Sequence, residues 1–238
     1  MGPLRSSRWE PWRLLFARSG AAPAIFGIGA CFSNTTILGI PIVLRAFGDA
    51  AAVPLALILG FHSALLFTLT TVVAEVGAGI GVPLRDLLRN VGRGLTTNPI
   101  LWGIAGGLLL NALDLELPAI VDQFAAMLGG AALPTALFAL GSNLARFHLT
   151  HTIREALVLT ALKNLVQPAI IYGLGAWVFA LSPVSLAVAV TIAALPTGIN
   201  AYLFAARYDA ATPEATSTIL LSTLLATGTM TVLLGWLS

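Results

Sequence analysis

Charge is scarce in this chain of 238 residues: only 9% are Asp, Glu, Lys or Arg, whereas 58% are hydrophobic. A soluble domain needs a largely polar surface, and a chain with a mean hydropathy of +0.93 has too few polar residues to form one. The few basic residues are spread over the chain and do not gather on one face, which excludes nucleic acid as a partner. The composition predicts an integral membrane protein surrounded by a lipid bilayer.

Cysteine is almost absent as well, since Cys31 is the only one. A lone thiol excludes a disulfide framework and a thiolate metal site, and its expected role is that of a small buried hydrophobe. The sequence also lacks the His-Glu-x-x-His, Gly-x-Ser-x-Gly and Gly-x-x-x-x-Gly-Lys motifs and any pair of intramembrane aspartates. We therefore expect no enzyme, no cofactor, no bound metal and no use of ATP.

Long hydrophobic runs are abundant instead. About 20 apolar residues span a bilayer, and the chain holds seven such segments, at about 22–46, 51–76, 96–113, 118–145, 153–181, 183–206 and 214–237. They predict an all-α membrane protein, a polytopic helical bundle. The loop arginines fall mainly on one side if the N-terminus is inside and the C-terminus outside. Between the second and third spans, residues 82–95 predict an amphipathic helix on the inner membrane surface.

Two of the spans carry a polar, helix-breaking cluster at their centres: FSNTTILGIP at 32–41 and LPTGINAYLF at 195–204. An unpaired backbone group in hydrocarbon costs several kcal/mol, so such a break persists only beside a cavity or inside protein. Two breaks in matching positions are typical of the binding site of a secondary transporter. Each break is followed by Arg, Asp, alanines and Pro before the next span, which indicates a weak inverted repeat; chance similarity of alanine-rich loops is the alternative.

The breaks supply the chemistry of an anion site. A helix that restarts at mid-membrane presents free N–H groups and about half a positive charge, as at the helix N-termini that bind carboxylates. Asparagine amides and hydroxyls add donors, glycines allow close approach, and prolines remove N–H groups. The alternative is that these residues only pack helices together. The predicted substrate-binding residues are Ser33, Asn34, Thr35, Gly39, Pro41, Pro196, Thr197, Gly198 and Asn200.

Three further polar residues lie inside predicted spans. Lys163 lies about 15 Å along its span at the helical rise, too deep for easy snorkelling. It could balance an anionic substrate, replace a bound cation at helix C-terminal carbonyls or a carboxylate, or form a fixed structural pair; Gln167 lies one turn along the same face. His62 could take part in proton coupling, or form a hydrogen bond between helices.

The sequence around the breaks resembles the auxin efflux carrier family. The resemblance rests on Asn34–Pro41 (NTTILGIP), Ala193–Ala205 (AALPTGINAYLFA), Leu137–Gly141 (LFALG) and Lys163–Pro168 (KNLVQP). Family members include plant auxin exporters and bacterial carriers of malonate or other organic acids. The resemblance implies ten helices in two inverted repeats of five, with a scaffold part, a transport part, crossing fourth and ninth helices, and a homodimer through the scaffold.

The seven spans match the last seven of those ten. On this basis residues 1–20 are a cytoplasmic loop, 21–81 the end of the first repeat, 82–95 the interfacial helix and 96–238 the second repeat. The prediction is a secondary transporter that exports small organic anions (carboxylates) from a bacterial cytoplasmic membrane by alternating access, coupled to protons or sodium if at all. The alternative is a truncated, inactive fragment or an assembly subunit. A channel is disfavoured because the polarity is confined to one depth.

Overall fold

The computed structural model of the protein describes residues 20–79, 83–97, 99–145, 147–148 and 152–237. Every regular element in these residues is helical, apart from one isolated bridge. Within the described residues, three helices are long and apolar enough to cross a membrane, at Asp49–Gly77, Ile153–Val178 and Thr212–Leu237. The predicted class of an all-α membrane protein is thus confirmed. The predicted N-terminal loop lies, up to residue 19, outside the described residues.

The helices follow the predicted segments closely. The first broken span consists of α2 (Ala22–Cys31), the π-helical turn η1 (Thr35–Gly39) and α3 (Ile40–Phe47), and a short turn, η2 (Asp49–Ala51), leads into α4 (Ala52–Gly77). Next come α5 (Leu84–Thr96), α6 (Pro99–Ala112) and α7 (Ala119–Leu144). The span after them is α8 (Ile153–Ala161), η3 (Leu162–Val166), α9 (Gln167–Gly173) and η4 (Leu174–Val178). The second broken span is α10 (Pro183–Ala194) and α11 (Asn200–Arg207), and α12 (Thr212–Leu237) is last.

Both predicted breaks are present. The first begins where α2 ends at Cys31, and Pro41 then lies in the first turn of α3. The second begins where α10 ends at Ala194 and the backbone of Leu195 becomes extended. Proline fits the place of Pro41 because the first turn of a helix needs no N–H from it.

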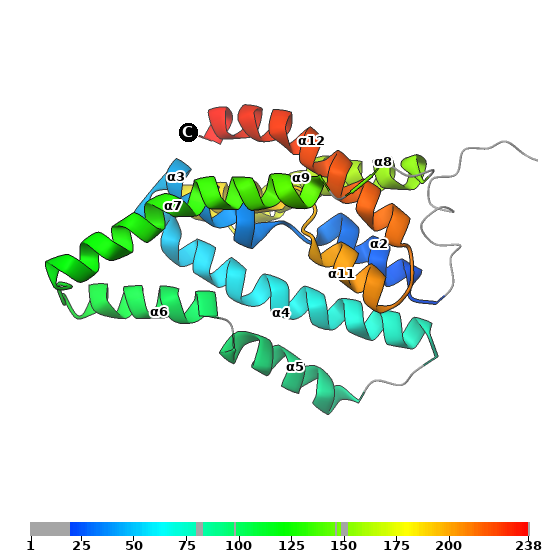
Figure 1. Ribbon diagram of the computed structural model, residues 1–238, viewed down its shortest axis with the longest axis horizontal. Helices are drawn as coiled ribbons and strands as arrows, with labels where there is room; N and C mark the ends of the chain where they lie inside the picture. The colour runs from blue at the N-terminus through cyan, green and yellow to red at the C-terminus, as the bar shows by residue number, and fades with distance from the viewer. Residues whose placement is uncertain (1–19, 80–82, 98, 146, 149–151, 238) are drawn as a thin grey trace, which may run out of the picture.

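The two broken spans lie at the centre of the molecule. Figure 1 shows α2 and α11 side by side, with α4 running along one side and α12 along the other, and contacts between these elements agree with this view. The largest apolar core joins α3, α4, α10 and α12, with Val43, Leu55, Val188 and Leu195 almost fully buried. Burial of these side chains fixes how the breaks meet.

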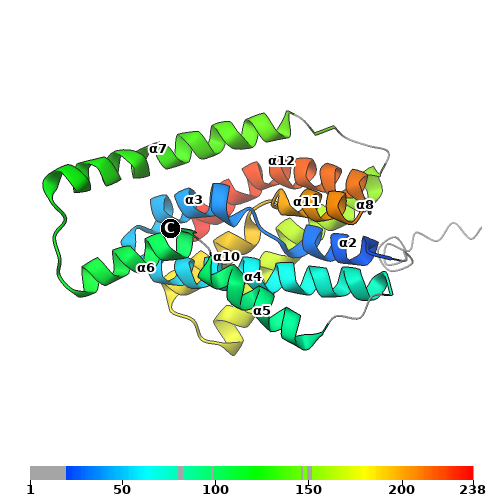
Figure 2. The ribbon, with the colours of Figure 1, turned by 60° about the horizontal axis from the view of Figure 1, so that its bottom comes forward.

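Helices α5, α6 and α7 lie outside this centre. Figure 2 shows α7 along one side of the bundle and α6 near α4. Helix α5 packs along α4 and exposes its charged side chains, while α7 contacts η1 and α3. A helix forms where the interfacial helix is predicted; its place at a membrane surface stays a prediction. The apolar face that the sequence predicts for this helix consists of Leu84, Leu87, Leu88 and Val91; Leu88 is exposed, and the other three side chains are not among those that the structure describes.

The prediction for Cys31 is wrong. Its side chain is exposed, not buried. Cys31 ends α2, and the helices that pack on α2 leave its side uncovered. The small, apolar character of a residue at the end of a broken helix therefore did not predict whether its side chain is buried.

Candidate substrate site at the crossing of two broken helices

The two breaks are joined by a reciprocal pair of backbone hydrogen bonds. The Asn34 N–H donates to the Pro196 carbonyl over 2.9 Å, and the Gly198 N–H donates to the Phe32 carbonyl over 2.9 Å. Together they form one short antiparallel bridge in the middle of the bundle. Each break thus satisfies backbone groups that the other leaves unpaired, which explains how non-helical chain persists in an apolar environment.

In each break, the backbone N–H of the central residue donates to a side chain of another helix. The Ser33 N–H donates to Nε2 of His62 on α4 over 3.2 Å, and the Thr197 N–H donates to Oγ of Ser222 on α12 over 3.1 Å. Each acceptor comes from the long helix that follows its own broken span. His62 therefore acts as a hydrogen-bond acceptor between helices, and its ring must be neutral at Nε2 to do so.

A single span holds the ends of both first half-helices. The Gln167 amide donates to the carbonyl of Cys31, the last residue of α2, over 2.9 Å. Lys163 Nζ donates to the carbonyl of Ala193, near the end of α10, over 2.5 Å, and the Lys163 side chain is completely buried. Carbonyls at a helix C-terminus lack partners in the helix and carry partial negative charge, so a buried cation and an amide are suitable donors.

The second half-helices begin around a common cavity of about 240 Å³. It is lined by Phe32, Asn34, Thr35, Thr36, Ile37, Gly198, Ile199 and Asn200. Residues from the N-terminal turns of η1 and of α11 line it, so the positive ends of the second half-helices point to one place, although the Thr35 N–H already donates to the Ser33 carbonyl over 2.8 Å. Among the residues that the structure describes, neither the Asn34 nor the Asn200 side chain has a hydrogen-bond partner, which leaves both amides available to a ligand.

The other predicted site residues lie elsewhere. Ser33, His62 and Gln167 line a separate cavity of about 140 Å³. The Thr197 hydroxyl donates to the Gly29 carbonyl over 2.8 Å, so its proton is used in holding α2. Pro196 lines a third, apolar cavity. The structure thus brings together four of the nine predicted substrate-binding residues, Asn34, Thr35, Gly198 and Asn200, and adds Phe32, Thr36, Ile37 and Ile199.

The glycines permit the close approach expected of them. A Cβ atom on Gly198 would lie 2.7 Å from the Phe32 ring and 3.2 Å from the Ser33 carbonyl oxygen. A Cβ atom on Gly39 would lie 2.8 Å from Ile192 Cδ1. A side chain at Gly198 would therefore press on the ring and on the backbone of the first break, whereas at Gly39 the flexible end of the Ile192 side chain would have to move aside.

Asn164 makes structural contacts, although the sequence analysis assigned no role to it. Its amide nitrogen donates to the Ser222 carbonyl over 3.2 Å and to the Ala194 carbonyl over 3.5 Å. The signal was present, because Asn164 follows Lys163 directly in KNLVQP. Ser222 was harder to recognise because α12 carries many Ser and Thr residues that only bond to their own helix.

Comparison with known proteins identifies the family. A model of the membrane transport protein family matches residues 12–234. The chain belongs to the auxin efflux carrier family. The resemblance and the prediction of a membrane transport protein are therefore confirmed, and the family is one of transporters, not of enzymes.

Three relatives show how far the similarity extends. A protein of Rhizobium meliloti (strain 1021), provisionally named a malonate transporter, is 29% identical over 93% of this chain and 69% of its own length. An uncharacterized transporter of Methanothermobacter thermautotrophicus is 27% identical over 83% of this chain and 63% of its own length. Auxin efflux carrier component 1 of Arabidopsis thaliana is 32% identical over 58% of this chain, but only 23% of its own length is covered.

Proposed function

We propose that the protein is a secondary carrier for small organic anions, which bind in the cavity between the second half-helices. The observation that carries this proposal is the convergence of two helix N-termini and two unpaired asparagine amides on one cavity of about 240 Å³. Carboxylates are the ligands that such donors favour. Malonate is a suitable first substrate because a relative of this chain is named for it.

The crossing separates the two kinds of helix end, and this supports the choice of an anion. The negative ends of α2 and α10 are held by Gln167 and Lys163, whereas the positive ends of the second halves face the cavity. We propose that Lys163 replaces a bound cation at the end of α10, so that no metal ion is needed there. Without Lys or Arg in the cavity, an anion would be held loosely enough to be released.

We further propose alternating access, in which the crossing moves relative to helices outside it. The reciprocal hydrogen bonds support motion of both breaks as one unit, since separating them would leave four backbone groups unpaired. Helix α7, which contacts η1 and α3, is a candidate for the element against which this unit moves. We also propose that the protein exports its substrate and lies in a bacterial cytoplasmic membrane with the N-terminus inside. The proposal further includes an inverted repeat and a homodimer. The exposed apolar side chains of Ile120, Phe124 and Met127 on α7 support a partner or lipid on that face.

The test measures malonate binding and malonate flux in proteoliposomes made from the whole chain. Asn34→Ala and Asn200→Ala should each weaken binding by about 1–3 kcal/mol, because each removes a donor to a charged group. Asn111→Ala, an exposed asparagine at the end of α6, is the matched control and should bind as the wild type does. Unchanged binding in both site variants would show that the substrate does not bind at these asparagines. No binding of any carboxylate by the wild type would refute the proposed function.

A further inference from the structure

Four backbone N–H groups without an acceptor surround the crossing cavity, the space of about 240 Å³ between the second half-helices. They belong to Thr36 and Ile37 in the first break and to Ile199 and Asn200 in the second, and all four residues line the cavity. Among the residues that the structure describes, none accepts a hydrogen bond from these N–H groups. A carboxylate, which only accepts hydrogen bonds, would satisfy donors of this kind.

Asn34 adds a side-chain donor that is buried and yet open to the cavity. Only 7% of its surface is exposed, and it lines the cavity. Within the described part of the chain its amide has no hydrogen-bond partner, and, unlike the Ser33 hydroxyl, it is not closed off from the solvent. An amide beside free backbone N–H groups provides donors for both oxygens of one carboxylate.

The crossing cavity also provides about one unit of positive charge. The positive ends of the helix Thr35–Phe47, which joins η1 and α3, and of α11 point to it. Each such end carries about half an elementary charge. Among the described residues that line the cavity, none is charged. An anion with one negative charge would therefore be balanced, whereas a second negative charge would have no counterpart.

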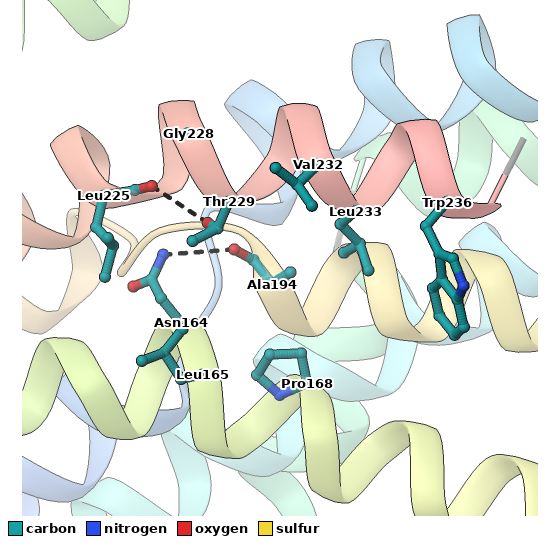
Figure 3. A pocket seen from close by; sticks show the side chains of 10 residues that line it. All are labelled: Asn164, Leu165, Pro168, Ala194, Leu225, Gly228, Thr229, Val232, Leu233 and Trp236. Atoms are coloured by element: carbon teal, nitrogen blue, oxygen red, sulfur yellow. Dashed lines mark hydrogen bonds between the residues drawn. The ribbon is translucent and has the colours of Figure 1, made fainter.

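The negative ends of the first half-helices are balanced elsewhere. The buried Lys163 donates to the Ala193 carbonyl, and Figure 3 shows the Asn164 amide nitrogen turned toward the Ala194 carbonyl, 3.5 Å away. The end of α2 is held by Gln167, and η3, which carries Lys163, contacts both α2 and α10. One lysine charge thus serves two negative ends of about half a charge each, and none of it is left for the substrate.

The rest of the lining is apolar and leaves little room. The side chains of Ile37 and Ile199 are partly exposed and line the cavity together with Phe32. Its volume of about 240 Å³ lies below the range of roughly 300–1,000 Å³ that is typical of sites for drug-sized ligands. The part of a ligand that lies beyond its carboxylate should therefore be apolar and short.

We propose that the crossing cavity selects short aliphatic monocarboxylates over dicarboxylates. The carboxylate accepts from the Asn34 amide and from the free N–H groups of the two breaks, and the aliphatic body lies against Ile37 and Ile199. This inference rests on the proposed carrier function and narrows its substrate class. A dicarboxylate such as malonate binds mainly as its monoanion.

The test measures binding of acetate, propionate, butyrate and malonate to the whole chain in lipid nanodiscs by isothermal titration calorimetry. Each methylene group added from acetate to butyrate should tighten binding about four-fold, since burying one contributes about 0.8 kcal/mol. At neutral pH malonate is mainly a dianion and should bind about ten-fold more weakly than butyrate, or weaker still. Malonate binding should tighten several-fold as a weakly acidic pH forms its monoanion, and butyrate at the same pH controls for changes in the protein.

Two variants locate the aliphatic body. Ile37→Ala and Ile199→Ala should each reduce the gain per methylene group to about two-fold or less, because each removes part of the apolar wall. Ile170→Ala changes an isoleucine of α9 that is 54% exposed, and this matched control should keep the four-fold gain.

The outcomes separate this inference from the carrier function itself. If malonate bound at neutral pH as tightly as butyrate, or if chain length had no effect, the preference for monocarboxylates would be refuted while the carrier function stood. If none of the four carboxylates bound to the wild type, both the inference and the proposed function would be refuted.

Discussion

Removing the acceptor that His62 offers to the first break should destabilise the crossing of the broken helices. His62→Leu leaves the Ser33 N–H, which is completely buried, without its partner at 3.2 Å. A buried donor left unpaired costs about 1–3 kcal/mol. The contact between the His62 and Phe32 rings, whose centroids are 5.0 Å apart, is worth about 0.5–1.5 kcal/mol more. We therefore expect His62→Leu to lower the free energy of unfolding by about 2–4 kcal/mol.

His62→Gln separates the two contributions, because the amide oxygen of glutamine can accept from the Ser33 N–H while the ring is lost. This variant should recover most of the hydrogen-bond part. Equilibrium unfolding in detergent micelles measures all three proteins. Protonation of His62 would turn Nε2 into a donor, so the wild type should lose stability as the pH falls through the titration of this ring, and His62→Gln should not. Equal stability of the Leu and Gln variants at neutral pH would refute the role of His62 as a backbone acceptor.

Two further substitutions test the crossing. Lys163→Met should abolish or uncouple transport while the protein stays folded in the membrane, because methionine keeps the apolar stem. The lost hydrogen bond of about 1.5–3 kcal/mol is offset by removing the cost of a buried charge. Proteoliposome flux over a range of pH measures the effect on transport. Gly198→Ala should lower the free energy of unfolding by about 1–3 kcal/mol, since its Cβ atom would lie 2.7 Å from the Phe32 ring; equilibrium unfolding measures it.

Each of these substitutions has its own control. Flux at the wild-type rate in the Lys163→Met protein would show that the buried charge is dispensable. For the glycine, Gly228→Ala is the matched change, because a Cβ atom at Gly228 meets nothing within 4 Å. If Gly198→Ala and Gly228→Ala were equally stable, the close approach of the two breaks would not matter for stability.

The elements of the fold could be predicted from the sequence because each is encoded locally. Apolar runs give the helices, and the breaks follow from Pro, Gly and Asn inside such runs. Asn34 and Asn200 could be assigned to one place because the breaks that carry them occur at matching depths. That they bind a substrate stays a prediction, as do the domain boundaries and the orientation in the membrane.

The partners of individual side chains could not be predicted, because they depend on how distant segments meet. Ser33 and Thr197 occupy matching places in the two breaks, yet the Thr197 hydroxyl bonds to Gly29 and the Ser33 hydroxyl has no partner among the described residues. The local sequence holds no sign of this difference. Cys31 is a similar case, since its exposure depends on which helices cover the end of α2 and not on its apolar neighbours.

The partner of the first break is synthesised long after the break itself. Thr197 and the Gly29 carbonyl that it contacts are 168 residues apart in the chain. At about 5–20 residues per second, translation needs on the order of 10 s to cover that distance. During this interval the Asn34 N–H lacks the Pro196 carbonyl, and the Phe32 carbonyl lacks the Gly198 N–H. Hydrocarbon offers no other hydrogen-bond partner. The first broken span is therefore expected to remain in contact with the insertion machinery, or with water, until its late partner arrives and releases it into the bilayer.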